Sequence, residues 1–256
     1  MRVLVCVKRV PAVAGRLTLT EDERALDTKY VGFQVGPHEE CAVEEAVRLA
    51  ERFGGSVTVV SLGPAEAEEQ LRACLALGAS AAVLVETAPG VETGPMATAA
   101  ALHSVAASGG FDLILLGNEA SDSGGYQVGI RLAHLLGRPV ATGAKAIEVS
   151  ADGSSLSASR AYRGATETFT LPLPCVVTVK EGINLPRYPS LPGRLRAKRA
   201  AVKRIPLQAG PVPAGDIRMT RLRVPEAPRK QATVLGQGPA AVPALVAVLA
   251  ELGVIS

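Results

Sequence analysis

The sequence of 256 residues contains no tryptophan, and aromatic residues make up only 3% of it. With so few aromatic side chains to stack on bases, a single-stranded nucleic-acid-binding protein is disfavoured. No apolar run approaches the ~20 residues that a bilayer requires, so we also expect no membrane insertion. The hydrophobic fraction of 48% excludes a largely disordered chain and indicates a core of aliphatic side chains.

Cysteines are few and scattered. Cys6, Cys41, Cys74 and Cys175 form no C-x-x-C pair, which indicates free buried thiols in a reducing compartment and no metal site. The first residues lead directly into an apolar run at 3–7 without the pattern of a targeting segment. We therefore expect a cytoplasmic protein of bacterial type.

The common catalytic motifs are missing as well. The sequence has no Walker A motif, no G-x-G-x-x-G after the first strand, no H-E-x-x-H and no G-x-S-x-G. Only three histidines are present: His103 and His134 lie within helical patterns, and His38 has no obvious nucleophile beside it. We expect a protein that is not an enzyme and has no catalytic residues of its own.

What the sequence does contain is a regular alternation of short apolar runs and helical patterns over residues 1–140. This alternation predicts crossover units, and hence an α/β fold with a doubly wound, mainly parallel sheet. Strands are expected at 3–7, 56–62, 81–86 and 111–116, and helices at 39–53, 63–77, 96–107 and 124–136.

The pattern changes after Pro139. Three runs at 144–149, 156–162 and 166–171 predict an antiparallel extension, and the run at 174–180 predicts a last strand of the main sheet. From Gly182 onward the chain is rich in proline and basic residues, which predicts an extended arm. An apolar helix at 240–252 ends the arm and is expected to pack on another chain.

The most informative segment is the small, polar, Gly-rich loop that follows the apolar run at 111–116. In open α/β sheets, ligands bind beyond the carboxyl ends of the strands, and the N–H groups at a helix start favour a phosphate. Glycines let the backbone approach such a ligand closely. On these features alone, a phosphate site and an ordinary turn are equally open. Gly36-Pro37-His38-Glu39, before another expected helix, is a weaker candidate of the same kind.

Four segments resemble the beta subunits of electron transfer flavoproteins, in the same order and over nearly the whole chain. They are V-L-V-C-V-K-R-V-P at 3–11, C-A-V-E-E-A-V-R-L at 41–49, L-L-G-N-E-A-S-D-S-G-G-Y-Q-V-G at 115–129, and L-P-C-V-V-T at 173–178 with N-L-P-R-Y-P-S-L-P at 184–192. The resemblance implies a heterodimer in which the alpha subunit holds most of the FAD and the beta subunit holds a structural AMP. It also implies electron transfer in fatty acid oxidation, from acyl-CoA and related dehydrogenases to electron transfer flavoprotein-quinone oxidoreductase.

The resemblance places AMP contacts in four segments, at the first two strands, the first helix start and the Gly-rich loop. The residues are Cys6, Gly36, Pro37, His38, Glu39, Leu62, Gly117, Asn118, Glu119, Ala120, Ser121, Asp122, Ser123, Gly124, Gly125, Tyr126, Gln127 and Val128. It places the loop that recognises the dehydrogenase at 187–198. There Leu191 is the expected anchor, with Arg194, Arg196 and Lys198 around it.

The loop also departs from the family. The usual threonine is Val128 here, so phosphate binding would rest on backbone N–H groups, Ser123 and Gln127. Two alternatives remain open: a bifurcating-type subunit that binds a second FAD instead of AMP, and a free-standing adenine-nucleotide-binding protein. The basic run at 187–204 fits either a solvated basic surface or a surface that docks an acidic partner.

The expected organisation has two parts. A nucleotide-binding α/β domain is predicted at 1–204 and includes the recognition loop. A C-terminal arm is predicted at 205–256, where it ends in a helix that packs on the alpha subunit.

Overall fold

The computed structural model describes residues 1–12, 17–88, 90–91, 93–208, 216–225 and 232–255. Two compact units are present, Met1–Leu222 and Arg223–Ser256, and each is described by itself. Within the described residues, no helix is both long enough and apolar enough to span a bilayer.

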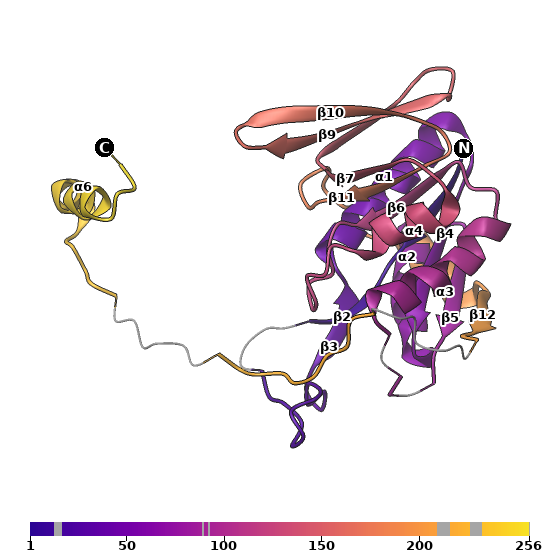
Figure 1. The fold of residues 1–256 in the computed structure, drawn as a ribbon, viewed down its shortest axis with the longest axis horizontal. Coiled ribbons are helices and arrows are strands. Elements are labelled where there is room, and N and C mark those ends of the chain that lie inside the picture. Colours follow the sequence, from indigo (N-terminus) through magenta and orange to yellow (C-terminus); the bar gives the residue numbers. More distant parts are fainter. Residues whose placement is uncertain (13–16, 89, 92, 209–215, 226–231, 256) are drawn as a thin grey trace. The chain divides into compact units, whose positions relative to one another are not determined.

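The first unit is built on a seven-stranded sheet in the order β12-β5-β4-β1-β6-β11-β7 (Figure 1). All neighbouring strands of this sheet are parallel. The strands are β1 (Arg2–Cys6), β4 (Ser56–Gly63), β5 (Ala81–Glu86), β6 (Leu113–Gly117), β7 (Val140–Ala144), β11 (Cys175–Val179) and β12 (Val202–Pro206).

Helices cover both faces of the sheet, which confirms the doubly wound α/β fold. Along β1, Val3 and Val5 belong to one apolar core while Leu4 and Cys6 belong to the other, as the two-residue period of a strand requires. The first core includes side chains of α1 (Pro37–Phe53), α2 (Glu68–Leu77) and α5 (Leu191–Arg199), and the second includes α3 (Pro95–Ser108) and α4 (Val128–Leu136). A short 3₁₀ helix, η1 (Ala65–Ala67), precedes α2.

Two antiparallel sheets complete this unit. Strands β8 (Ala146–Val149), β9 (Ser155–Tyr162) and β10 (Ala165–Pro172) form the extension that the sequence predicts. Strands β2 (Arg9–Ala12) and β3 (Gly32–Val35) pair with each other between the strand expected at 3–7 and the helix expected at 39–53, where no element is predicted.

Two expectations about local structure are wrong. The helix expected from Gly124 begins at Val128, because Gly124 and Tyr126 have φ angles of 55° and 54° that interrupt a right-handed helix. The segment after Gly182 is not simply extended, because it contains α5 and then β12, which pairs with β5 at the edge of the central sheet. The Ser190 hydroxyl accepts a hydrogen bond from the Gly193 N–H at 3.2 Å and caps α5.

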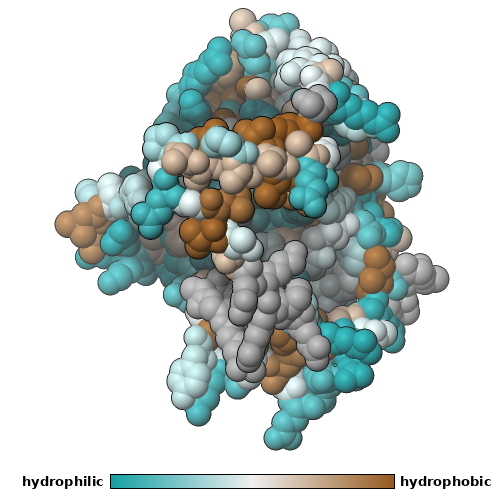
Figure 2. Space-filling view, turned by 90° about the vertical axis from the view of Figure 1, so that its left-hand side faces the viewer, coloured by the Kyte–Doolittle hydropathy of each residue, from teal (hydrophilic) through white to brown (hydrophobic). Residues whose placement is uncertain are grey.

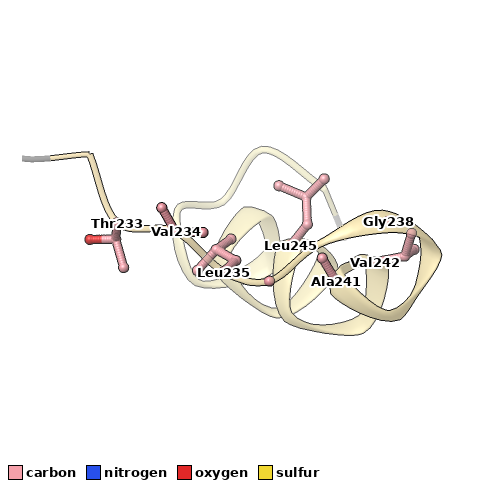
Figure 3. Close-up of a pocket in the computed structure, with 8 residues that line it drawn as sticks. Thr233, Val234, Leu235, Gly238, Ala241, Val242 and Leu245 are labelled. Carbon is pink, nitrogen blue, oxygen red and sulfur yellow. The ribbon is translucent and has the colours of Figure 1, made fainter.

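The second unit contains the predicted C-terminal helix. The helical region of this unit is formed by η2 (Gly238–Ala241) and α6 (Val242–Glu251), and no residue of α6 is buried. Apolar side chains of this unit are exposed, among them Val242, Leu245, Val246 and Leu252, and apolar side chains are brown in the foreground of Figure 2. Leu235, Val242 and Leu245 line a hollow of about 370 Å³ beside α6 (Figure 3). The helix therefore exposes the kind of surface that helices normally bury.

Candidate nucleotide-binding site

The expected site lies where the winding of the sheet reverses. From β1 the chain continues to β4 and β5 on one side, and it later returns to add β6 on the other side. Cys6 of β1 lies in register between Val60 of β4 and Leu116 of β6. The carboxyl ends of these three strands therefore meet at the topological switch point, where open α/β sheets bind their ligands.

The start of α1 closes against the end of β6 through Glu39. A Cβ atom on Gly117 would lie 2.8 Å from Cδ of Glu39, and one on Gly36 would lie 2.3 Å from its Oε2. Both positions thus require glycine for the Glu39 side chain to lie between them. This contact brings together two segments of the expected site that are far apart in the sequence, Gly36–Glu39 and the Gly-rich loop that begins at Gly117.

Glu39 is an unusual carboxyl group. Its residue is only 4% exposed, and its Oε2 atom has no hydrogen-bond partner within the described residues. Burial raises the pKa of Glu39 to about 7. The side chain lies in the first turn of α1, where the positive end of the helix dipole favours an anion. A phosphate placed at this helix start would meet a carboxyl group already there.

Lys8 connects the end of β1 to the Gly-rich loop. Its Nζ donates to Oδ1 of Asp122 at 2.6 Å and to Oγ of Ser123 at 3.3 Å. The sequence analysis does not include Lys8 in the site, although it lies within the V-C-V-K-R-V-P segment, two residues after Cys6. The structure thus adds a cation beside the loop proposed to hold a phosphate.

The beginning of the Gly-rich loop is fixed to β11. The Asn118 N–H donates to the Val179 carbonyl at 2.9 Å, and the Thr178 hydroxyl donates to Oδ1 of Asn118 at 2.7 Å. The same hydroxyl accepts a hydrogen bond from the Gly143 N–H at 3.0 Å. A buried hydrogen-bonded group at the loop entrance gives a defined backbone course to the residues that follow.

The rest of the loop is open. Residues 121–126 are exposed, and a Cβ atom on Gly124 or Gly125 would meet nothing within 4 Å. The Glu119 carboxylate, which accepts a hydrogen bond from the hydroxyl of Tyr126, raises the pKa of Tyr126. Oε1 of Gln127 accepts two hydrogen bonds from Arg131, at 3.1 and 2.8 Å. The side-chain NH₂ group of Gln127 is thereby oriented as a donor.

Other expected contacts lie at the base of the site. Cys6 is 5% exposed and belongs to the core beneath α3 and α4, and burial raises its pKa to about 12. Leu62 and Val128 pack, partly buried, against the same core. The Cys6 thiol is thus an apolar packing group rather than a reactive one. His38 has a buried Nδ1 atom without a partner in the described residues, and burial lowers its pKa.

The expected docking residues lie elsewhere, on α5. The predicted recognition loop is a helix from Leu191 onward, which corrects its expected conformation. Leu191 and the basic side chains around it are all exposed, namely Arg194, Arg196 and Lys198. They form no part of the nucleotide site. Within the described residues, no group of three or more His, Cys, Asp or Glu side chains is arranged to hold a metal ion.

Comparison with known proteins identifies the family of the chain. The model of the electron transfer flavoprotein domain matches residues 25–209, most of the chain. The chain belongs to the electron transfer flavoprotein family. Its similarity to electron transfer flavoprotein subunit beta of Bradyrhizobium diazoefficiens is 40% identity over 79% of this chain and 80% of the relative.

Further members of the electron transfer flavoprotein family give similar values. The human subunit beta is 38% identical over 79% of this chain and 80% of its own length, and the Bacillus subtilis subunit beta is 39% identical over 68% and 67%. The resemblance found in the sequence motifs is therefore confirmed. Membership of this family assigns the chain to electron transport and to a flavoprotein.

Proposed function

We propose that this chain is the beta subunit of a heterodimeric electron transfer flavoprotein, in which it holds a structural AMP and supports the FAD of the alpha subunit. The observation that carries the proposal is the meeting of β1, β4, β6, the start of α1 and the Gly-rich loop at one switch point. The chain contributes no catalytic residue. Its role is to hold the flavin-bearing partner and an electron donor in place.

The phosphate of AMP is proposed to lie at the Gly-rich loop rather than at the start of α1. Gly125 leaves room for a close approach, and Lys8 and the NH₂ group of Gln127 supply positive charge and a donor. The start of α1 already contains the buried Glu39 carboxyl group, which lies between Gly36 and Gly117 and would repel a phosphate once it is ionised. Cys6, Leu62 and Val128 would then form the apolar side of the site.

The exposed surface of α5 is proposed to dock acyl-CoA and related dehydrogenases. Leu191 supplies an apolar anchor, and no acidic residue occurs between 187 and 204 to oppose an acidic partner. Electrons would pass from the docked dehydrogenase to the FAD and then to electron transfer flavoprotein-quinone oxidoreductase. The C-terminal unit is proposed to pack on the alpha subunit, because α6 is apolar and buries nothing by itself.

Co-expression with the alpha subunit tests this function. We expect one FAD and one AMP per heterodimer, both identified by chromatography after denaturation. A monomer that turns over nucleotide without a flavin-bearing partner would contradict the proposal. The open space around Gly124 and Gly125 also favours a second candidate, in which a second FAD takes the place of AMP and the complex bifurcates electrons. Two FAD molecules per heterodimer would identify it.

A further inference from the structure

The segment that leads into α5 exposes unusually large side chains. Leu185 is 90% exposed, Tyr188 is 96% exposed and Leu191 is 71% exposed, within seven consecutive residues. Single exposed apolar residues are common on proteins, but a close series of them marks an interaction surface. We call residues 184–195 the docking segment, since they include and precede the proposed anchor Leu191.

Ion pairs between Arg187 and two carboxylates of α1, one buried and one exposed, fix this segment to α1. Glu44 has a side chain only 7% exposed, and it receives three hydrogen bonds from Arg187: from the backbone N–H at 3.1 Å, from Nε at 2.9 Å and from Nη2 at 3.1 Å. Glu51, further along α1 than Glu44, accepts hydrogen bonds from Nη1 and Nη2 of Arg187 at 2.7 and 3.1 Å. These two carboxylates raise the pKa of Arg187.

Further contacts hold both ends of the docking segment. Nδ2 of Asn184 donates to the Cys41 carbonyl and to Oε2 of Glu45, each at 3.0 Å. Arg72 of α2 donates to the Ala197 carbonyl at 2.6 Å, and a Cβ atom on Gly193 would lie 2.5 Å from the carbonyl oxygen of Ala76. The backbone is therefore tightly attached on either side of the exposed apolar side chains.

The hydrogen bonds of Arg187 constrain the orientation of the chain as well as neutralising the two carboxylates. A guanidinium fork that meets two carboxylates sets both the position and the orientation of the chain, which a lysine ammonium does not. Leu191 follows Arg187 by only four residues. The backbone between them is restricted by Pro189 and by the Ser190 cap, and Pro186 restricts it just before Arg187. A surface held in its bound conformation loses less entropy when it docks.

We infer that Arg187 is a positioning residue for docking: its ion pairs with Glu44 and Glu51 hold Leu191 and Tyr188 in the orientation that a dehydrogenase recognises. This inference rests on the proposed function of α5. It extends that function by assigning the exposed side chains a rigid support on α1. The nucleotide site also uses α1, at its other end, through Glu39.

The test is a double-mutant cycle in the purified heterodimer with its alpha subunit. Arg187→Gln, Leu191→Ala and the double variant are compared by stopped-flow reduction of the flavin over a range of dehydrogenase concentrations. We expect Arg187→Gln to raise the concentration for half-maximal rate by about fivefold while the limiting rate stays unchanged. Because Arg187 acts through Leu191, its effect should largely disappear in the Leu191→Ala background.

Two further variants make the outcome specific. Arg160→Gln breaks an ion pair of similar exposure, with Glu167 of β10, and should leave docking unchanged. Glu51→Gln removes the exposed partner of Arg187 and leaves Glu44 in place. If Arg187→Gln yields no heterodimer, Glu51→Gln tests the positioning role in its place. A smaller increase, in the same direction, is expected for Glu51→Gln, and Arg187→Lys should restore docking only in part.

The outcomes separate this inference from the proposed function. If Leu191→Ala weakens docking and neither Arg187→Gln nor Glu51→Gln does, the positioning role is overturned while the docking surface stands. Fully additive effects of Arg187→Gln and Leu191→Ala would also overturn it. If Leu191→Ala leaves docking unchanged, the proposed docking function of α5 fails, and the positioning role fails with it.

Discussion

The two units of this chain bury apolar surface in opposite ways. Residues 1–222 enclose two apolar cores, one on each face of a parallel sheet, whereas α6 contains eight aliphatic residues and buries none of them. The first unit therefore has the interior of an independent domain. The second has the composition of a core helix without a core, and we expect its stability to depend on a surface that another chain supplies.

The boundary between the two units lies further along the chain than residue 204, where the sequence predicts it. β12 continues past residue 204 and pairs with β5 as far as Pro206. Beyond it, the Asp216 carboxylate accepts hydrogen bonds from the Met96 and Ala97 N–H groups, both at 3.0 Å, and caps α3. Arg221 forms an ion pair with Glu23. Part of the expected arm thus belongs to the first unit.

Truncation of the chain is expected to have the largest effect, because it separates the contributions of the two units. A chain that ends at Leu222 should keep its fold and its nucleotide but lose the alpha subunit completely, because α6 and its apolar surface are removed. A chain that ends at Ala201 should instead lose thermal stability, because it lacks β12 and the Asp216 cap. Circular dichroism and pull-down with tagged alpha subunit measure both. Recovery of the alpha subunit by the Leu222 truncation would show that α6 is dispensable.

A second change acts only on the first unit. Gly125→Asp should expel the nucleotide, because it places negative charge and bulk where the phosphate is proposed to lie. Gly125→Ala is the matched control and should retain the nucleotide, since a Cβ atom there meets nothing within 4 Å. Chromatography of the denatured heterodimer gives the occupancy. Full occupancy in Gly125→Asp would place the phosphate elsewhere.

A third change tests how the stability of the first unit depends on pH through Glu39. The folded state holds the Glu39 proton up to about pH 7, so the stability that this group contributes is present below its ordinary pKa and is lost as pH rises through 7. Relative to the parent, Glu39→Gln should therefore gain about 2 kcal/mol between about pH 5.5 and pH 8.5. Urea unfolding of the nucleotide-free chain measures this difference. A difference that does not change with pH would mean that Glu39 titrates normally.

The last change concerns a surface of the first unit that lies outside both cores, where an effect on docking and none on folding is expected. Leu191→Ala should weaken dehydrogenase docking by about tenfold or more, because burial of one leucine contributes about 1.5–3 kcal/mol. Folding, AMP content and FAD content should not change. Stopped-flow reduction at several salt concentrations separates the leucine from Arg194, Arg196 and Lys198, whose removal should alter the salt dependence of the on-rate. An unaltered rate in Leu191→Ala would exclude it from the interface.

Sequence periodicity predicts the fold well where side chains enter a core on every second or every third to fourth residue, as in β1 and α1. It misses β12, whose five residues include only two partly buried aliphatic side chains and whose partner β5 lies more than 100 residues earlier. It also misses α5, because the close approach of Gly193 to Ala76 is a contact between distant segments.

The candidate site was predictable in its segments but not in its chemistry. A Gly-rich loop after a buried strand is a local pattern, so residues 117–128 could be identified from the sequence. Glutamate is usually exposed, and nothing local marks Glu39 as buried. The contact of Lys8 with Asp122 joins residues 114 positions apart and depends on the adjacency of β1 and β6.

The contrast between the units is tested most directly by amide hydrogen exchange of the chain alone and in complex with its alpha subunit. The account predicts that amides of β1, β4 and β6 are protected in both states, whereas those of α6 exchange rapidly in the free chain and become protected only in the complex. Equal protection of α6 in the free chain and in the complex would contradict it, because the helix would then be stable without a partner.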